Sequence, residues 1–154
     1  MKLGKADCDN CSLGKALAKS AEWVPVETER HTDDRVVLLG EAPGGHEVME
    51  GRPFVGPSGI ELQGALDAAG VRRDECRIVN VIACRPPENK LSNFLTRASR
   101  ANKKRENPLL MPQVACRERM LEDIRGFDRV ICLGAEAARA MRGGHVSIMG
   151  VRGG

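Results

Sequence analysis

Aromatic side chains are scarce in this chain of 154 residues, where they form 3% of the sequence and tyrosine is absent. The rings are those of Trp23, Phe54, Phe94 and Phe127. Because 42% of the residues are nevertheless hydrophobic, we expect one domain with a core of Val, Leu, Ile and Ala. An exposed ring would therefore call for a functional reason.

Long apolar runs are also missing. No stretch of about 18 apolar residues occurs, so the sequence predicts no membrane-spanning helix. The N-terminus, MKLGKADCDNC, lacks the apolar segment of a secretion signal. We therefore expect an intracellular, cytoplasmic protein, in which disulfides are disfavoured.

A strong overall charge is absent too, since the net charge is only +3. The positive charges are unevenly placed, however, because residues 97–105, RASRANKKR, carry five of them and no negative charge. Such a block suits a phosphate backbone, although a solvated loop has the same composition. The five basic residues are Arg97, Arg100, Lys103, Lys104 and Arg105.

Glycine and proline are concentrated in residues 40–59, GEAPGGHEVMEGRPFVGPSG, which contain six glycines and three prolines. This segment follows a short apolar run, which predicts a loop at the end of a strand. Glycines there let another molecule approach the backbone closely. No Gly-Lys-Ser/Thr sequence follows the glycines, which excludes a nucleotide-binding P-loop.

Apolar runs alternate with helical patterns along the rest of the chain. Buried strands are predicted at residues 35–39, 77–83, 129–134 and 145–149. Helices are predicted from Ser58, as the cap, to Gly70, and at residues 113–125 and 135–141. This alternation indicates an α/β fold with a mostly parallel sheet covered on both faces. Ligands bind beyond the carboxyl ends of such strands, where the glycine loop and the CRPPENK segment lie.

The six cysteines need an explanation other than disulfides. Cys8 and Cys11 form a CxxC pair, and two further cysteines, Cys84 and Cys116, flank an irregular segment. These four favour a metal site, for which zinc and an iron–sulfur cluster both remain open on spacing alone. The other two, Cys76 and Cys132, are expected to be structural.

Several segments occur together in one order: GEAPGGHE, GRPFVGPSG, IVNVIACRPPENK and VICLGAEAARAM, with the four metal-site cysteines around them. From about residue 8 to residue 152 this pattern resembles the iron–sulfur class, or family 4, of uracil-DNA glycosylases. The resemblance implies a three-layer α/β/α sandwich with a central four-stranded sheet, formed by a single domain over residues 1–154. It also implies a structural 4Fe–4S cluster on Cys8, Cys11, Cys84 and Cys116, in preference to zinc. The implied activity is base excision repair, in which uracil is hydrolysed from DNA.

The resemblance implies a base pocket around the glycine loop, because a glycosylase must extrude its base and enclose it. Phe54 would stack on the uracil. Asn80, a polar residue inside an apolar strand, would offer its amide donor and acceptor to O4 and N3–H of uracil and reject cytosine. The further substrate-binding positions are Gly40, Ala42 and Asn89.

Two glutamates of the loop, Glu41 and Glu47, are the candidate catalytic residues. Cleavage of the N-glycosidic bond produces a sugar with oxocarbenium character and a uracil anion. A carboxylate could stabilise this cation or orient the attacking water. Since Ala42 stands where other classes carry an acidic side chain, we expect stabilisation of the leaving anion to matter more than a strong base.

Two departures from the family pattern affect these expectations. The sequence stops at VRGG before the histidine motif of the family, so we expect a C-terminally short domain. The alternative is therefore a catalytically weak or inactive nucleic-acid-binding module of the same fold, as part of a larger or truncated protein such as a viral one. An electron-transfer iron–sulfur protein is a less favoured interpretation. The second departure is a long interval of 31 residues between Cys84 and Cys116, which we interpret as a basic insertion loop, residues 88–112. Its five cations are expected to contact DNA, and the protein is expected to be a monomer acting on uracil-containing DNA.

Overall fold

Three parallel strands form the centre of the fold, in the spatial order β2-β1-β3. They appear in a computed structural model that describes residues 3–20, 23–95 and 108–142. The strands are β1 (Val36–Gly40), β2 (Cys76–Asn80) and β3 (Val130–Cys132). Val37, Leu39, Ile78 and Val79 are fully buried in this sheet. A parallel sheet covered on both faces requires such near-continuous apolar strands, which explains why the sequence does not alternate here.

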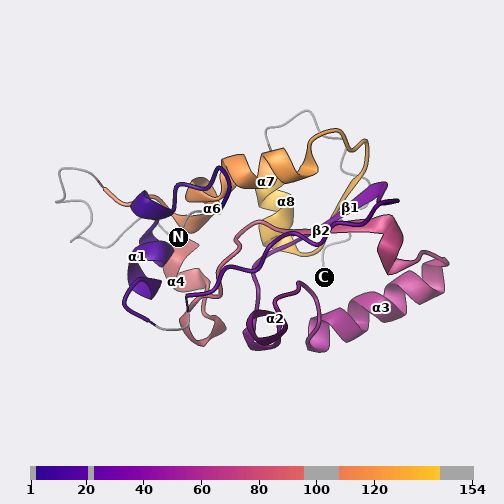
Figure 1. Ribbon diagram of the computed structural model, residues 1–154, viewed down its shortest axis with the longest axis horizontal. Helices are drawn as coiled ribbons and strands as arrows, with labels where there is room; N and C mark the ends of the chain where they lie inside the picture. Colours follow the sequence, from indigo (N-terminus) through magenta and orange to yellow (C-terminus); the bar gives the residue numbers. More distant parts are fainter. Residues whose placement is uncertain (1–2, 21–22, 96–107, 143–154) are drawn as a thin grey trace.

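Helices cover the sheet from two sides. Figure 1 shows α7 (Arg117–Ile124) and α8 (Ala135–Met141) on one side, and α2 (Gly45–Glu50) and α3 (Pro57–Ala69) on the other. Alternate residues of β1 face opposite ways. Leu39 packs in a core with Met120 and Ala137, whereas Leu38 packs in a second core with Leu62.

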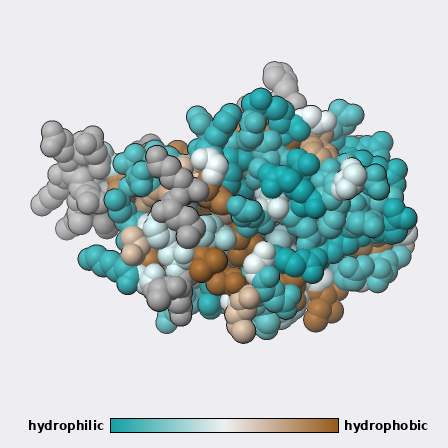
Figure 2. Space-filling model, viewed as in Figure 1, coloured by the Kyte–Doolittle hydropathy of each residue, from teal (hydrophilic) through white to brown (hydrophobic). Residues whose placement is uncertain are grey.

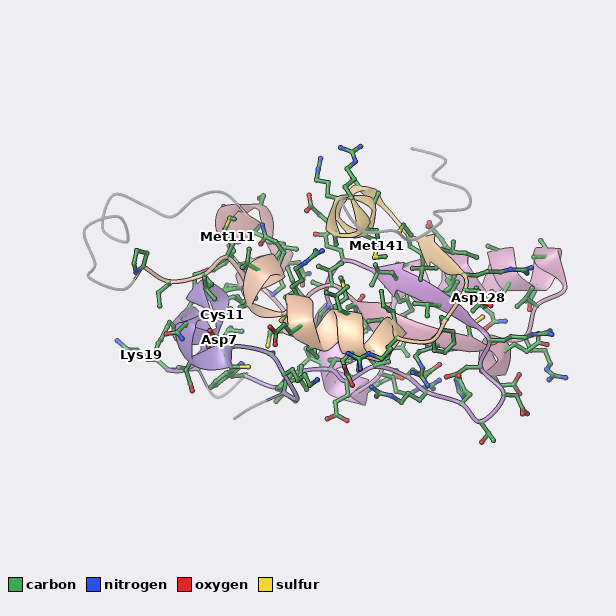
Figure 3. All side chains as sticks on the ribbon, turned by 90° about the horizontal axis from the view of Figure 1, so that it is seen from above. Asp7, Cys11, Lys19, Met111, Asp128 and Met141 are labelled. Carbon is green, nitrogen blue, oxygen red and sulfur yellow. The ribbon has the colours of Figure 1, made fainter. Side chains whose placement is uncertain are left out.

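Short elements gather at one end of the molecule. They are η1 (Cys8–Asn10), α1 (Ser12–Leu17), α4 (Ser92–Leu95) and α6 (Pro112–Ala115) (Figure 1). Two backbone bonds join them, from the N–H of Ser12 to the carbonyl of Leu110 (2.9 Å) and from the N–H of Asp7 to the carbonyl of Ala115 (2.9 Å). Figure 3 shows Asp7, Cys11 and Met111 together at this end, with Asp128 toward the other end.

The predicted α/β fold class with a parallel sheet is confirmed. The sheet has three strands in the part of the chain that the structure describes, and the fourth predicted strand, 145–149, lies outside those residues. The expected helix at 113–125 is divided into α6 and α7 at Cys116, and the predicted helix at 135–141 is α8. The irregular segment after β2 also contains a short helix, α4.

Two expectations about the glycine segment are wrong. Ser58 does not cap α3, because Gly56 is the N-cap and Pro57 the first helical residue, where its missing N–H costs nothing. The predicted terminator Gly70 is confirmed, with φ 67°. The loop at 40–59 also contains a helix, α2, which ends at Gly51 in the left-handed conformation.

None of the helices in the described ranges is long and apolar enough to cross a bilayer. Figure 2 shows a mostly hydrophilic face, with hydrophobic atoms along its lower edge around α2 and the start of α3. These helices carry Met49 and Ile60, whose exposed fractions are 88% and 75%.

Candidate active site and four-cysteine pocket

The carboxyl ends of β1 and β2 place Gly40 beside Asn80. These residues are register partners in the parallel ladder. The pairing continues beyond the strands, since the N–H of Val81 donates to the carbonyl of Gly40 (2.8 Å) and that of Ile82 to Glu41 (2.9 Å). The glycine loop therefore leaves the sheet from a rigid, hydrogen-bonded edge.

Phe54 reaches the same position from the far end of the loop. A Cβ atom built on Gly40 would lie 2.5 Å from Cε2 and Cζ of the Phe54 ring and 2.6 Å from Oδ1 of Asn80. Ring and amide therefore converge on the bare main chain of Gly40. Asn80 is buried, and its Oδ1 has no hydrogen-bond partner among the described residues. A buried acceptor without a partner is costly, so this oxygen is suited to a donor from a ligand.

Backbone strain is concentrated around this loop. Among the described residues, the non-glycine residues with positive φ are Phe54 (51°), Glu88 (55°) and Asn89 (59°). Phe54 lies against Gly40, and Oδ1 of Asn89 lies 3.9 Å from a Cβ built on Gly44. Strained residues of this kind cluster at ligand-binding and catalytic sites.

Glu47 is a buried carboxylate inside the loop. Its side chain comes from α2 and lies between two glycines, with Oε1 3.4 Å from a Cβ built on Gly44 and Oε2 3.1 Å from one built on Gly56. Oε2 is buried without a hydrogen-bond partner in the described chain. The carboxylate can therefore accept a hydrogen bond from a water or a ligand.

Glu41, the other candidate, lies at the mouth of the loop beside α8. Glu41 as a whole is exposed, but its carboxyl group is partly desolvated. This desolvation is the main cause that raises the pKa of Glu41. The neighbouring Glu136 raises the pKa further, and Arg139 opposes the shift. Because Glu41 is exposed, its carboxyl group remains accessible to water.

Arg85 belongs to this site, although the sequence interpretation did not include it. Its guanidinium lies 3.4 Å from a Cβ built on Gly45, and its Nε donates to Oδ1 of Asn89 (2.8 Å). The side chain is half-buried, so a cation borders the loop beside Asn89. Its position directly after Cys84, at the carboxyl end of a strand, was the sequence signal that could have identified it.

Four cysteines line one pocket at the end of the molecule where α1 and α6 meet. The pocket contains Cys8, Cys11, Cys84 and Cys116, with Trp23 and Ile82 among the surrounding side chains. Cys11 is brought close by an isolated bridge to Leu110. The four predicted metal-site cysteines, which come from three separate parts of the sequence, therefore line the same pocket.

Burial disfavours the ionised form of two of these thiols, those of Cys11 and Cys84. It raises the pKa of Cys11, which backbone hydrogen bonds from Gly14 and Leu13 partly oppose. It also raises the pKa of Cys84 to about 12; an interaction with Trp23 opposes this shift, and the other three thiols add to it. The thiols must lose protons to bind a metal, so an electropositive group is needed to hold them as thiolates.

Two kinds of metal group need different arrangements of thiolate ligands. In the described part of the chain, no three His, Cys, Asp or Glu side chains lie close enough together to hold one metal ion. Four thiolates on a single zinc would have to approach to about 2.3 Å from that ion. A cluster instead takes each thiolate on a different iron, so its cysteines stand farther apart around a larger pocket.

Trp23 provides a second observation at this pocket. Its indole Nε1 is buried and has no hydrogen-bond partner among the described residues. The same group nevertheless lies near enough to Cys84 to lower the pKa of that thiol. A buried N–H beside a cysteine sulfur suits a thiolate ligand better than a neutral thiol, because a thiolate accepts the stronger hydrogen bond. The residues present therefore fit an iron–sulfur cluster.

The remaining predicted residues divide into three groups. Ala42 is half-buried and packs against the main core next to the loop. Cys76 and Cys132 are buried in the two hydrophobic cores, as expected of structural cysteines. The basic block, Arg97, Arg100, Lys103, Lys104 and Arg105, lies outside the described residues.

Comparison with known proteins gives one consistent family. The family model for the uracil DNA glycosylase superfamily matches residues 28–152. The type-4 uracil-DNA glycosylase of Thermotoga maritima is 37% identical over 128 residues, which cover 81% of this chain and 58% of that protein. The corresponding enzyme of Pyrobaculum aerophilum is 47% identical over 87 residues, covering 56% of this chain and 42% of its own.

A third relative, the type-4 uracil-DNA glycosylase of Archaeoglobus fulgidus, is 39% identical over 83 residues, which cover 54% of this chain and 39% of that protein. The matched part therefore spans 39–58% of the length of these three relatives. The family match extends over most of the 154 residues, from the segment before β1 to a point beyond α8. The chain belongs to the uracil DNA glycosylase superfamily, and the relatives that it resembles here are type-4 enzymes.

Proposed function

We propose that this chain is a single uracil-DNA glycosylase domain that binds an extruded uracil at Gly40 and hydrolyses its N-glycosidic bond. The observation that supports this most directly is the convergence of the Phe54 ring and the Asn80 amide on Gly40. Base-specific enzymes extrude the target base and hold it by stacking and by hydrogen bonds to its pairing edge. The type-4 relatives carry this activity in their names.

In this proposal, Asn80 selects the base. Uracil presents N3–H as a donor and O4 as an acceptor, so one amide can accept through Oδ1 and donate through Nδ2. The buried, unpaired Oδ1 would then acquire its missing partner. Cytosine has the opposite pattern and would leave both polar groups of Asn80 unpaired, which disfavours it strongly. Phe54 would add a stacking contribution of about 1–3 kcal/mol.

The carboxylates act on the sugar side of the bond in this scheme. As the bond breaks, positive charge develops on the sugar and negative charge on uracil. Glu47, with its unpaired Oε2, would hold the attacking water or stabilise the sugar cation. Glu41 would assist from the solvent side, and Arg85 beside Asn89 would attract a phosphate of the substrate strand.

We further propose that Cys8, Cys11, Cys84 and Cys116 hold a 4Fe–4S cluster. The cluster would stabilise the end of the molecule that carries the segment after β2, and it supplies structure rather than a reaction step. This proposal rests on the shared pocket and the unpaired Trp23 N–H. Anaerobic reconstitution with iron and sulfide should give a brown protein, and a colourless product would refute it.

The basic block at residues 97–105 completes the proposed DNA contact. Its five cations would neutralise backbone phosphates, so binding should weaken steeply as salt rises. Replacing all five by glutamine should reduce the slope of log affinity against log salt without changing the preference for uracil over cytosine.

The decisive test of the proposed function is the variant Asn80→Asp. An aspartate keeps the size of asparagine but loses the donor to O4 and places a charge beside the base. We expect the preference for a uracil-containing single strand over its cytosine counterpart to fall at least about tenfold, in both binding and cleavage.

Asn93→Asp, a change of the same type at an exposed residue of α4, is the matched control and should leave this preference unchanged. An Asn80→Asp protein that still prefers uracil as the wild type does would refute the assignment. Uracil-specific binding by the wild type without any cleavage would support the alternative of a non-catalytic binding module.

A further inference from the structure

We propose that Arg73, fixed by Glu29, is a positioning residue that holds Phe54 against Gly40 and Asn80. Neither residue belongs to the segments that make up the glycine loop. The proposal deepens the proposed function, because it explains how the stacking ring is kept in place, but its structural part can be tested without DNA.

Arg73 binds the backbone on both sides of the Pro53–Phe54 peptide. Its Nη1 donates to the carbonyl of Phe54 (2.9 Å) and its Nη2 to the carbonyl of Pro53 (2.6 Å). The remaining edge of the guanidinium faces Glu29, with Nε 2.9 Å from Oε2 and Nη2 3.2 Å from Oε1. One planar cation therefore connects a carboxylate to two successive carbonyls, a geometry that only a guanidinium provides.

Glu29 is itself anchored to the central sheet. Its backbone exchanges two hydrogen bonds with Ile78 of β2, at 2.9 and 3.0 Å. Its side chain is 9% exposed and also accepts from Nε (3.0 Å) and Nη2 (2.8 Å) of Arg52. Arg52 directly precedes Pro53, so residues 52–54 are tied to one buried carboxylate attached to the core.

Phe54 needs such an anchor because its own backbone is unfavourable. Its φ of 51° lies in the left-handed region, which a bulky residue adopts only when its surroundings enforce it. Its carbonyl is pressed against α3, where a Cβ built on Gly59 would lie 2.1 Å from the oxygen. Arg73 holds this carbonyl from the other side, which directs the ring toward Gly40.

A second buried ion pair provides a matched control. Nε of Arg77 lies 3.0 Å from Oδ2 of Asp34, with side-chain exposures of 21% and 7%, close to the 19% and 9% of Arg73 and Glu29. Arg77 also donates to the carbonyl of Asp123 and lies 4.7 Å from the ring centroid of Phe127. It therefore holds a different phenylalanine with a similar pair.

The test uses fluorine-labelled phenylalanine. The chain has three phenylalanines, so ¹⁹F NMR should give three resonances, which single Phe→Leu replacements assign. In Arg73→Ala, the Phe54 resonance should move toward its position in the unfolded protein while that of Phe127 stays. In Arg77→Ala the reverse is expected. Arg73→Lys should shift the Phe54 resonance less than Arg73→Ala, because lysine keeps the positive charge but lacks the forked donors of the guanidinium.

The same variants are then measured with a uracil-containing single strand. We expect affinity to fall about tenfold in Arg73→Ala and less than about twofold in Arg77→Ala. If Arg73→Ala does not fold, Glu29→Gln replaces it with the same readout. A folded variant of either kind in which the Phe54 resonance is unchanged would overturn the proposal.

The two proposals fail in different ways. A Phe54 resonance that moves in Arg73→Ala, together with a wild type that does not distinguish uracil from cytosine, would keep the positioning role and refute the glycosylase assignment. An unmoved resonance in a protein whose wild type binds uracil strands would refute the positioning role alone.

Discussion

Gly40 shows how much a single missing side chain can contribute to a site. It ends β1, pairs with Asn80 across the sheet and leaves a space into which the Phe54 ring projects. Any side chain would overlap both the ring and the amide at about 2.5 Å. The position therefore needs glycine for close approach, since its own φ is not among the positive values that favour glycine.

We predict that Gly40→Ala folds but loses uracil recognition. The new methyl group would push the Phe54 ring aside, because the ring can rotate whereas the buried Asn80 is held by its strand. Affinity for a uracil-containing strand should fall at least about tenfold, as measured by fluorescence anisotropy.

Gly64→Ala is the matched control, because nothing lies within 4 Å of a Cβ at this position of α3. It should leave binding unchanged and raise stability by up to about 1 kcal/mol through helix propensity. Equal affinity of Gly40→Ala and wild type for uracil would contradict the close-approach role.

At the scale of elements, the four-cysteine pocket depends on several short pieces of chain. Cys8 comes from η1 and Cys11 caps α1, whereas Cys116 lies at the break between α6 and α7. Cys84 follows β2 by four residues. None of these elements is long enough to be stable alone, so a group bound by all four thiols would order the whole end of the molecule.

We predict that Trp23→Phe weakens retention of the cluster. Phenylalanine keeps a ring beside Ile82 but removes the N–H that lies near Cys84. Loss of such an outer partner typically costs about 10–100-fold in metal affinity. The absorbance of the reconstituted cluster should therefore decay about tenfold faster in the presence of an iron chelator.

The control is Phe127→Leu, which alters a ring in contact with Arg77 and away from the pocket. The cluster absorbance of this variant should decay at the wild-type rate. A Trp23→Phe protein that keeps its colour as long as the wild type does would show that the indole N–H makes no contribution.

At the scale of the whole molecule, residues 29–34, which precede β1, connect distant parts of the fold through ion pairs. Glu29 pairs with Arg73, Asp34 with Arg77, and Arg30 with Asp123 of α7. These partners lie 43 to 93 positions away in sequence. Because Glu29 and Asp34 are buried, removal of either charge would leave a guanidinium unpaired, which is strongly destabilising.

This network predicts an acid-dependent loss of stability. Burial alone would raise the pKa of Glu29, but hydrogen bonds from Arg73, His31 and Arg52 outweigh it and lower the pKa from 4.5 to about 2. The folded state therefore binds this proton less readily than the unfolded state. The contribution of Glu29, of the order of 3 kcal/mol, should be complete above the unfolded pKa and disappear as the pH falls toward 2.

The measurement is the free energy of unfolding in urea for wild type and Glu29→Gln, from about pH 7 down to about pH 3. The difference between the two proteins should be constant at the upper end and shrink below about pH 4.5. Glu118→Gln, which changes an exposed carboxylate of α7, should follow the wild type throughout. A difference independent of pH would exclude this role of the Glu29 charge.

Much of the architecture followed from local sequence. The apolar run at 35–39 predicted β1 to within one residue, and Gly70 marked the end of α3. Local patterns succeed here because strand burial and left-handed helix ends depend on neighbouring residues alone. The same logic failed at Ser58, because Gly56 and Pro57 already provided a helix start, and it missed α2 inside the glycine segment.

The sequence by itself therefore determined the strands, the glycine loop, the candidate pair Phe54 and Asn80, and the set of four cysteines. Only the tertiary structure revealed that Arg85 borders the loop and that Arg73 and Glu29 hold Phe54. The contacts of Arg73 join residues 19 to 44 positions apart along the chain. Periodicity and composition report interactions between residues that are close in sequence. The guanidinium of Arg73 can bind two carbonyls and a carboxylate only after the sheet has brought distant segments together.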